Sequence, residues 1–138
     1  MNTYRKHYLL ALLAAFVCSA CASEPQVVPS TGPRMATTPE KVNFYKQPPK
    51  KYEQLGTVTV TSAEGAKWDD RGDATEGFEI LKRKAAERGA NGLLLKAPKG
   101  EYEKLILAGY KGEYFQVPVK GRPGDATAIV EAIYVLEK

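Results

Sequence analysis

Apolar residues recur along this chain with two different periods, and the change of period separates the predicted strands from the predicted helix. Between Tyr52 and Thr61, Val58 and Val60 alternate with threonines, which predicts a strand with one buried face. Leu55 is out of phase with the two valines, and Gly56 separates it from them. We therefore expect a β-bulge at Gly56, because a bulge adds one residue to one strand of a pair.

A helical period replaces this alternation between Thr75 and Arg88. Apolar residues fall there at positions i, i+3 and i+7 and form one stripe of a helix: Phe78, Leu81 and Ala85. Gly89 comes directly afterwards and predicts a left-handed residue that ends the helix. The apolar run at residues 93–95 then predicts a strand that is covered on both faces.

Three further stretches complete the predicted sheet. Residues 42–45 read as a short first strand, and residues 102–119 read as a hairpin with its turn near 109–112. Pro118 suits an edge strand because it has no N–H for a sheet ladder. Residues 127–137 are apolar on both faces and predict a central strand. The fold class is therefore α+β: one small domain, residues 41–138, with a mixed or antiparallel sheet of about five strands packed on a single helix.

The N-terminus carries a targeting signal. Arg5 and Lys6 precede an apolar run from Leu9 to Ala20, which is shorter than the roughly 20 residues that span a bilayer. A basic head, a short apolar segment and small residues at its end are typical of a signal peptide. We assign residues 1–20 to this signal; an uncleaved anchor is the alternative.

Ser19-Ala20-Cys21 resembles the lipobox of bacterial lipoproteins, in which small residues precede an acylated cysteine. The resemblance implies lipidation of Cys21, although Cys18 stands where the usual lipobox has leucine. Cys18 itself suits acylation less well, because bulky Val17 precedes it. Ala22 follows in place of the aspartate that retains enterobacterial lipoproteins at the inner membrane, so the expected location is the outer membrane, facing the periplasm. A soluble periplasmic protein is the alternative.

Residues 21–40 are rich in proline, serine and threonine and poor in large apolar groups. Such a composition predicts a lipidated, disordered tether, because it offers little apolar surface to bury. In an extended form the tether would reach about 55 Å at about 3.1 Å per residue. On this view the tether holds the domain away from the membrane surface.

Removal of the signal peptide changes the charge and the candidate chemistry. Loss of Arg5 and Lys6 lowers the Lys and Arg count from 20 to 18 against 16 acidic residues, so the net charge falls from +4 to +2. This weak positive charge gives no support to a nucleic-acid partner. Both cysteines and the sole histidine lie at or before Cys21. The mature chain therefore lacks the residues of Ser-His-Asp and Cys-His catalysis, and we predict no enzyme activity and no cofactor.

Acidic residues offer two remaining chemical hypotheses. The loop before the helix has oxygen ligands for a calcium ion, but their spacing departs from that of an EF-hand: Asp69, Asp70, Asp73 and Glu76. Asp73 or Thr75 is instead expected to cap the helix. Trp68, in the same loop, is expected to lie against the edge of the fold. A hydrolase with a pair of carboxylates is formally open, although no spacing selects a pair.

The helix exit resembles a known turn. Residues 84–86 followed by Gly89–Gly92 and an aliphatic run look like the A-x-x-x-G-A-N turn of small bacterial envelope domains. These include YbjQ-like proteins, linked to heavy-metal binding, and the lipoprotein that senses stress for the Rcs phosphorelay; residues 131–134 resemble their closing strand. The Rcs resemblance implies a disulfide and the YbjQ resemblance implies metal ligands. This chain has no cysteine and no histidine after Cys21, so neither role is carried over.

The predicted function is a membrane-anchored binding or structural module of the cell envelope, attached through lipid on Cys21. An envelope protein or peptidoglycan is the expected partner, and an envelope-stress sensor is the alternative. Aromatic residues in the hairpin and lysines before the long strand are the candidate partner contacts: Tyr102, Tyr110, Tyr114, Phe115, Lys50 and Lys51, with Lys46 in the same basic corner. Cross-strand pairing is the structural explanation of the same aromatic residues.

Overall fold

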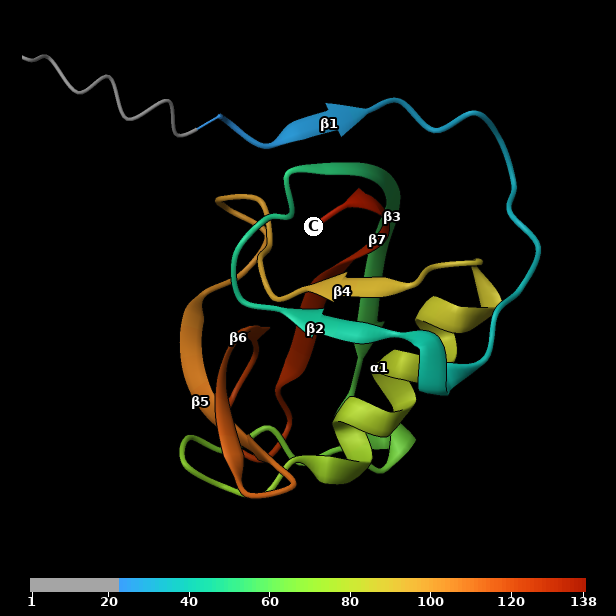
Figure 1. Ribbon diagram of the computed structural model, residues 1–138. Helices are drawn as coiled ribbons and strands as arrows, with labels where there is room; N and C mark the ends of the chain where they lie inside the picture. The colour runs from blue at the N-terminus through green and yellow to red at the C-terminus, as the bar shows by residue number, and fades with distance from the viewer. Residues whose placement is uncertain (1–22) are drawn as a thin grey trace, which may run out of the picture.

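A computed structural model describes residues 23–138 and shows a single mixed sheet packed on one helix (Figure 1). The sheet has seven strands: β1 (Gln26–Val28), β2 (Asn43–Tyr45), β3 (Lys51–Val60), β4 (Gly92–Leu94), β5 (Lys104–Tyr110), β6 (Glu113–Lys120) and β7 (Thr127–Glu137). The helix α1 is Thr75–Glu87, and two 3-10 turns are Pro39–Lys41 and Ser62–Glu64. The α+β class is confirmed, with more strands than the expected five or so.

Strand β7 is the centre of the sheet, as its two apolar faces predict. It pairs antiparallel with β3, β4 and β6, while β1 lies parallel to β3 and β2 lies parallel to β4. The predicted hairpin is formed by β5 and β6, which pair along their whole length. Pro118 lies in β6 opposite Leu105 of β5, beyond the two residues of β6 that pair with β7.

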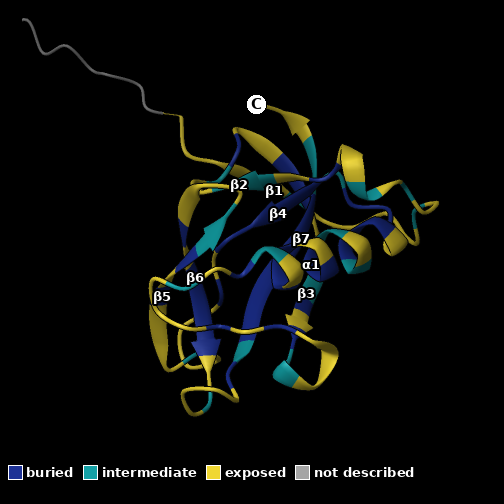
Figure 2. Cartoon of the chain, turned by 90° about the horizontal axis from the view of Figure 1, so that it is seen from below, coloured by how far each residue is buried: buried dark blue, intermediate teal, exposed yellow. Residues whose placement is uncertain are grey.

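The main core lies between α1 and one face of the sheet (Figure 2). The predicted helical stripe of Phe78, Leu81 and Ala85 is fully buried. Trp68 lies in the same core with 3% of its surface exposed, and its indole N–H donates to the carbonyl of Val60 at 3.0 Å. The expectation that Trp68 lies at the edge of the fold is therefore wrong, because the loop before α1 turns its ring inward against Phe78.

The bulge predicted at Gly56 is present. The register between β3 and β7 shifts between Gln54 and Gly56, and Gly56 has a φ of 109°. The shift places Leu55 against the main core together with the buried valines of β3. The guanidinium of Arg88 donates to the carbonyl of Thr57 at 2.6 Å beside the bulge.

Each residue of the turn Gly89–Gly92 has an identifiable role in the structure. Gly89 has the predicted left-handed φ of 77°. Ala90 is fully buried. The side chain of Asn91 accepts from the backbone N–H of Val135 at 2.6 Å and donates to its carbonyl at 3.2 Å. A Cβ on Gly92 would lie 2.8 Å from the ring of Tyr45, so the turn needs a glycine there.

The N-terminal segment, residues 26–41, is part of the fold, so the predicted tether is wrong over this range. Strand β1 pairs with β3, and the guanidinium of Arg34 contacts the buried carboxylate of Glu53. Thr37 donates its backbone N–H to Ala86 at 2.8 Å and its hydroxyl to Ala90 at 2.7 Å. Ala86 lies in the last turn of α1, whose carbonyls have no partner within the helix, and Ala90 lies in the turn that follows.

Residues 1–20, assigned to the signal peptide, and Cys21 lie outside the described residues. Within residues 23–138 no helix is long and apolar enough to cross a membrane.

Candidate functional site

The aromatic residues of the predicted hairpin divide between core and surface. Phe115 is 7% exposed and Tyr110 is half-buried, and both pack against the ring of Phe78 on α1. Phe44 of β2 completes this aromatic cluster, with its ring centroid 5.0–5.6 Å from those of its neighbours. Tyr114 is 54% exposed. Both explanations of the hairpin therefore apply: Phe115 and Tyr110 support the fold, and Tyr114 is available at the surface.

An open hollow lies between β2 and the tip of the hairpin. It has a volume of about 680 Å³, and its wall contains the aromatic cluster together with polar side chains at the rim: Asn43, Phe44, Tyr45, Lys46, Gln47, Tyr110, Lys111, Glu113 and Phe115. We call it the hairpin hollow. The Lys46 ammonium donates to the Glu113 carboxylate at 2.9 Å across it and lies 4.7 Å from the ring centroid of Phe115. This rim is exposed, so its ion pair is readily exchanged for water or for a partner.

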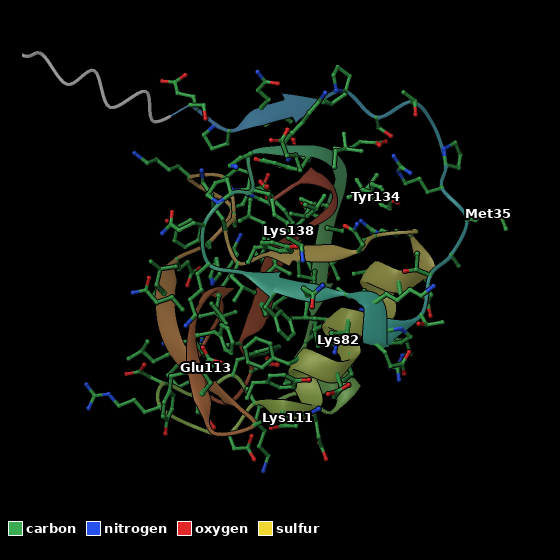
Figure 3. All side chains as sticks on the ribbon, viewed as in Figure 1. Met35, Lys82, Lys111, Glu113, Tyr134 and Lys138 are labelled. Carbon is green, nitrogen blue, oxygen red and sulfur yellow. The ribbon has the colours of Figure 1, made fainter. Side chains whose placement is uncertain are left out.

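Charged groups near the tip of the hairpin are linked to α1. The hydroxyl of Tyr110 donates to Glu79 at 2.6 Å, and Lys111 lies 3.4 Å from the same carboxylate. The Tyr110 hydrogen bond and, to a smaller extent, Lys111 lower the pKa of Glu79. Figure 3 shows Lys111 and Glu113 at the end of the molecule opposite Tyr134. The carboxylate of Glu79 thus accepts the hydrogen bond that orients the hydroxyl of Tyr110.

The outer face of the hairpin carries an exposed apolar patch. Leu105 is 49% exposed, Leu107 is 37% exposed and Tyr114 is 54% exposed; we call these three residues the outer patch. A second hollow of about 390 Å³ lies beside it. It is lined by two residues of the patch, by Gln116 of β6, by the residue after β4 and by the segment after β2: Leu107, Tyr114, Gln116, Leu95, Lys46 and Gln47. Lys46 and Gln47 line both hollows, so the hairpin hollow and the outer patch form one continuous candidate surface.

The other predicted partner contacts lie elsewhere. Tyr102 precedes β5, is half-buried and lines neither hollow. Lys50 and Lys51 are exposed but lie at the start of β3, where the carbonyl of Lys50 accepts from the N–H of Gln26 on β1. The structure thus separates the predicted contacts into two surfaces. Leu105 and Leu107 were missed, although their alternation with buried Ile106 places them on the outer face of the hairpin.

The acidic loop before α1 is built from hydrogen bonds to neighbouring backbone. The Asp70 carboxylate accepts from the backbone N–H of Leu107 at 2.9 Å, and the backbone N–H of Arg71 donates to the Leu107 carbonyl at 2.6 Å. The loop therefore covers the outer edge of β5. The Asp73 carboxylate accepts from the backbone N–H of Thr75 at 2.9 Å and from its hydroxyl at 2.7 Å. The N-cap residue of α1 is Ala74, which has no side-chain cap hydrogen bond, so the prediction that Asp73 or Thr75 is the N-cap is wrong. Among residues 23–138 the structure places no three His, Cys, Asp or Glu side chains where they could hold a metal ion together.

Two buried carboxylates differ in their surroundings. Hydrogen bonds from Arg34 lower the pKa of Glu53 on β3, which is 2% exposed. Burial raises the pKa of Glu131 on β7, which is 8% exposed, and Lys96 only partly offsets this effect. Neither residue lines the hairpin hollow or the hollow beside the outer patch. These two surfaces therefore do not contain the paired acids that a carboxylate hydrolase requires.

Comparison of the chain with protein-family models, with curated proteins and with solved structures finds no match. The resemblance to YbjQ-like proteins and to the Rcs stress sensor therefore stays a prediction from the helix exit and residues 131–134.

Proposed function

We propose that the protein is a lipid-anchored lipoprotein of the outer membrane that faces the periplasm and binds another envelope protein. The observation that carries the binding role is the continuous surface formed by the hairpin hollow and the outer patch. The hairpin hollow has an aromatic wall and a polar rim. The exposed leucines and Tyr114 lie on the other face of the same hairpin, and Lys46 and Gln47 connect the two parts. Protein interfaces commonly have this anatomy of an apolar, aromatic centre within a polar rim.

The chemistry of this surface favours a protein over peptidoglycan as the partner. Leu105 and Leu107 offer no hydrogen bonds to the hydroxyl and amide groups of a glycan strand, whereas they can be buried against apolar side chains. Because less than half of each leucine is exposed, covering the exposed part would contribute about 0.6–1.5 kcal/mol each. The rim charges Lys46 and Glu113 oppose each other, so the surface gives no preference for a partner of one charge sign.

Site-specific photocrosslinking in intact cells tests this role. A photoreactive residue at Tyr114 or Leu107 is expected to give one defined adduct with an envelope protein. The matched control is Arg83, an exposed residue of α1 outside the candidate surface. The side chain of Leu105 is already exposed, so Leu105→Lys is expected to remove the adduct without unfolding the domain. The binding role is wrong if positions 83 and 114 give the same products, or if Leu105→Lys leaves them unchanged.

A further inference from the structure

The N-terminal segment sets the distance between the predicted lipid and the domain. Gln26 begins β1, and its N–H donates to the carbonyl of Lys50 at 2.8 Å. Between Cys21 and Gln26 the chain can span at most about 17 Å, because an extended residue advances about 3.4 Å. If Cys21 carries the lipid, as the proposed function requires, β1 and the loop before β3 lie within this distance of the bilayer surface.

This end of the domain exposes apolar side chains. Val27 on β1 is 53% exposed, and Leu136 near the end of β7 is 47% exposed. Val27 pairs with Tyr52 of β3, and Tyr52 pairs with Val135, the residue before Leu136. The register of β3 and β7 shifts between Lys51 and Tyr52, so Leu136 lies at this irregularity without a partner on β3. We call Val27 and Leu136, with the adjacent exposed lysines Lys50, Lys51 and Lys138, the basal patch.

The charges of the basal patch nearly cancel. Lys51 lies opposite Glu137 in the register of β3 and β7. Glu24, which is also exposed, precedes β1. These acidic residues offset the attraction of the lysines for an anionic membrane. The apolar side chains and the short connection to Cys21 remain as the contributions that favour contact with the membrane.

We propose that the basal patch rests on the surface of a phospholipid bilayer and fixes the orientation of the domain there. Lysine side chains next to exposed apolar residues suit this position, because their ammonium groups extend to the headgroups while the apolar side chains face the acyl chains. Figure 1 shows the tip of the β5–β6 hairpin at the opposite end of the molecule from β1 and the C-terminus. The bound orientation leaves the hairpin tip directed away from the bilayer and accessible to an envelope partner.

Fluorescence quenching by brominated phosphatidylcholine tests this orientation. The acylated full-length mature protein is reconstituted into vesicles of this zwitterionic lipid, with a fluorophore on an introduced cysteine. Gln26→Cys and Glu137→Cys report on the basal patch, and Glu113→Cys and Glu76→Cys are controls on the hairpin and helix; all four positions are exposed. The proposal predicts at least about threefold stronger quenching at positions 26 and 137, because short-range quenching follows the depth of a side chain in the interface.

Two variants separate the basal patch from the short connection. A Gly/Ser insertion of about 15 residues after Ala22 lengthens the connection to the anchor. Quenching at position 137 that stays above the controls supports a contact made by the patch. Val27→Ser combined with Leu136→Ser is expected to bring quenching down to the level of the controls in this extended protein. Both side chains are exposed, so the fold does not depend on them.

Three results would overturn the proposal. They are equal quenching at all four positions, loss of the difference after the insertion alone, and loss of the difference in high salt, which would assign the contact to the lysines. Acylation is measured on the same samples by mass spectrometry. A protein without lipid on Cys21 would contradict the proposed function, whereas an acylated protein with equal quenching would contradict only the orientation.

Discussion

Gly89 is expected to be the position at which a single added methyl group separates the N-terminal segment from the domain. A Cβ on Gly89 would lie 2.5 Å from the Cβ of Arg34 and 2.7 Å from the carbonyl oxygen of Met35. Both contacts involve atoms on or next to the backbone, which cannot turn aside as the end of a long side chain can. In Gly89→Ala the N-terminal segment must therefore move away from the end of α1.

The cost has two parts that can be worked out separately. The left-handed conformation, with φ of 77°, costs a non-glycine residue about 1–2 kcal/mol. Overpacking against the segment adds about 1–3 kcal/mol. The free energy of unfolding should then fall by about 2–5 kcal/mol in Gly89→Ala. Displacement of the segment also removes the bonds from Thr37 to the carbonyls of Ala86 and Ala90.

Gly112 supplies the matched control. It has a left-handed φ of 83°, but a Cβ there would meet nothing within 4 Å. Gly112→Ala should therefore show only the conformational cost. Urea denaturation of both variants measures the difference, and proteolysis of the folded protein should show faster cleavage near Met35 in Gly89→Ala alone. Equal losses of stability in the two variants would refute the packing of the N-terminal segment against Gly89.

Two further predictions concern the side chain of Asn91 and the buried carboxylates of Glu53 and Glu131. Asn91→Ala should lower the free energy of unfolding by about 2–3 kcal/mol, because both backbone groups of Val135 lose their partner; a change below about 0.5 kcal/mol in urea denaturation would contradict this bond pair. Glu53→Gln and Glu131→Gln should have opposite effects on pH dependence. The lowered pKa of Glu53 contributes stability that is present above its ordinary pKa of 4.5 and is lost as the pH falls through the folded value. The raised pKa of Glu131 means that stability falls as the pH rises above 4.5 through the folded value. Thermal unfolding between pH 3 and 7 measures both effects. At neutral pH, Glu131→Gln should be more stable than the natural protein and Glu53→Gln should be less stable. Effects of the same sign in the two variants would refute these assignments.

The parts of the fold that the sequence predicts are those specified by neighbouring residues. The period of the apolar residues locates α1 and the long strands, and it makes β7 central. Gly56 and Gly89 are predicted because a bulge and a helix end each have a local signature. The N-terminal segment is specified by distant residues instead. Arg34 pairs with Glu53, and the hydroxyl of Thr37 bonds to Ala90, contacts that composition does not reveal.

Only part of the candidate surface can be predicted from the sequence, because the rest depends on contacts between distant residues. The hairpin places Tyr114 beside alternating exposed leucines, which is a local property of two strands. The approach of β2 to the hairpin depends on the parallel pairing of β2 with β4, and this pairing brings Lys46 to Glu113. The basic corner of Lys50 and Lys51 is separated from the hairpin because the chain crosses the sheet between β2 and β3.

Palmitate labelling of cells that produce the natural protein or Cys21→Ala tests the central claim most directly, since the anchor, the location and the basal patch all depend on Cys21. We expect label in the natural protein, a mature N-terminal peptide that begins with an acylated Cys21, and an unlabelled Cys21→Ala variant that leaves the membrane fraction. Unchanged labelling and membrane association of Cys21→Ala would contradict the account.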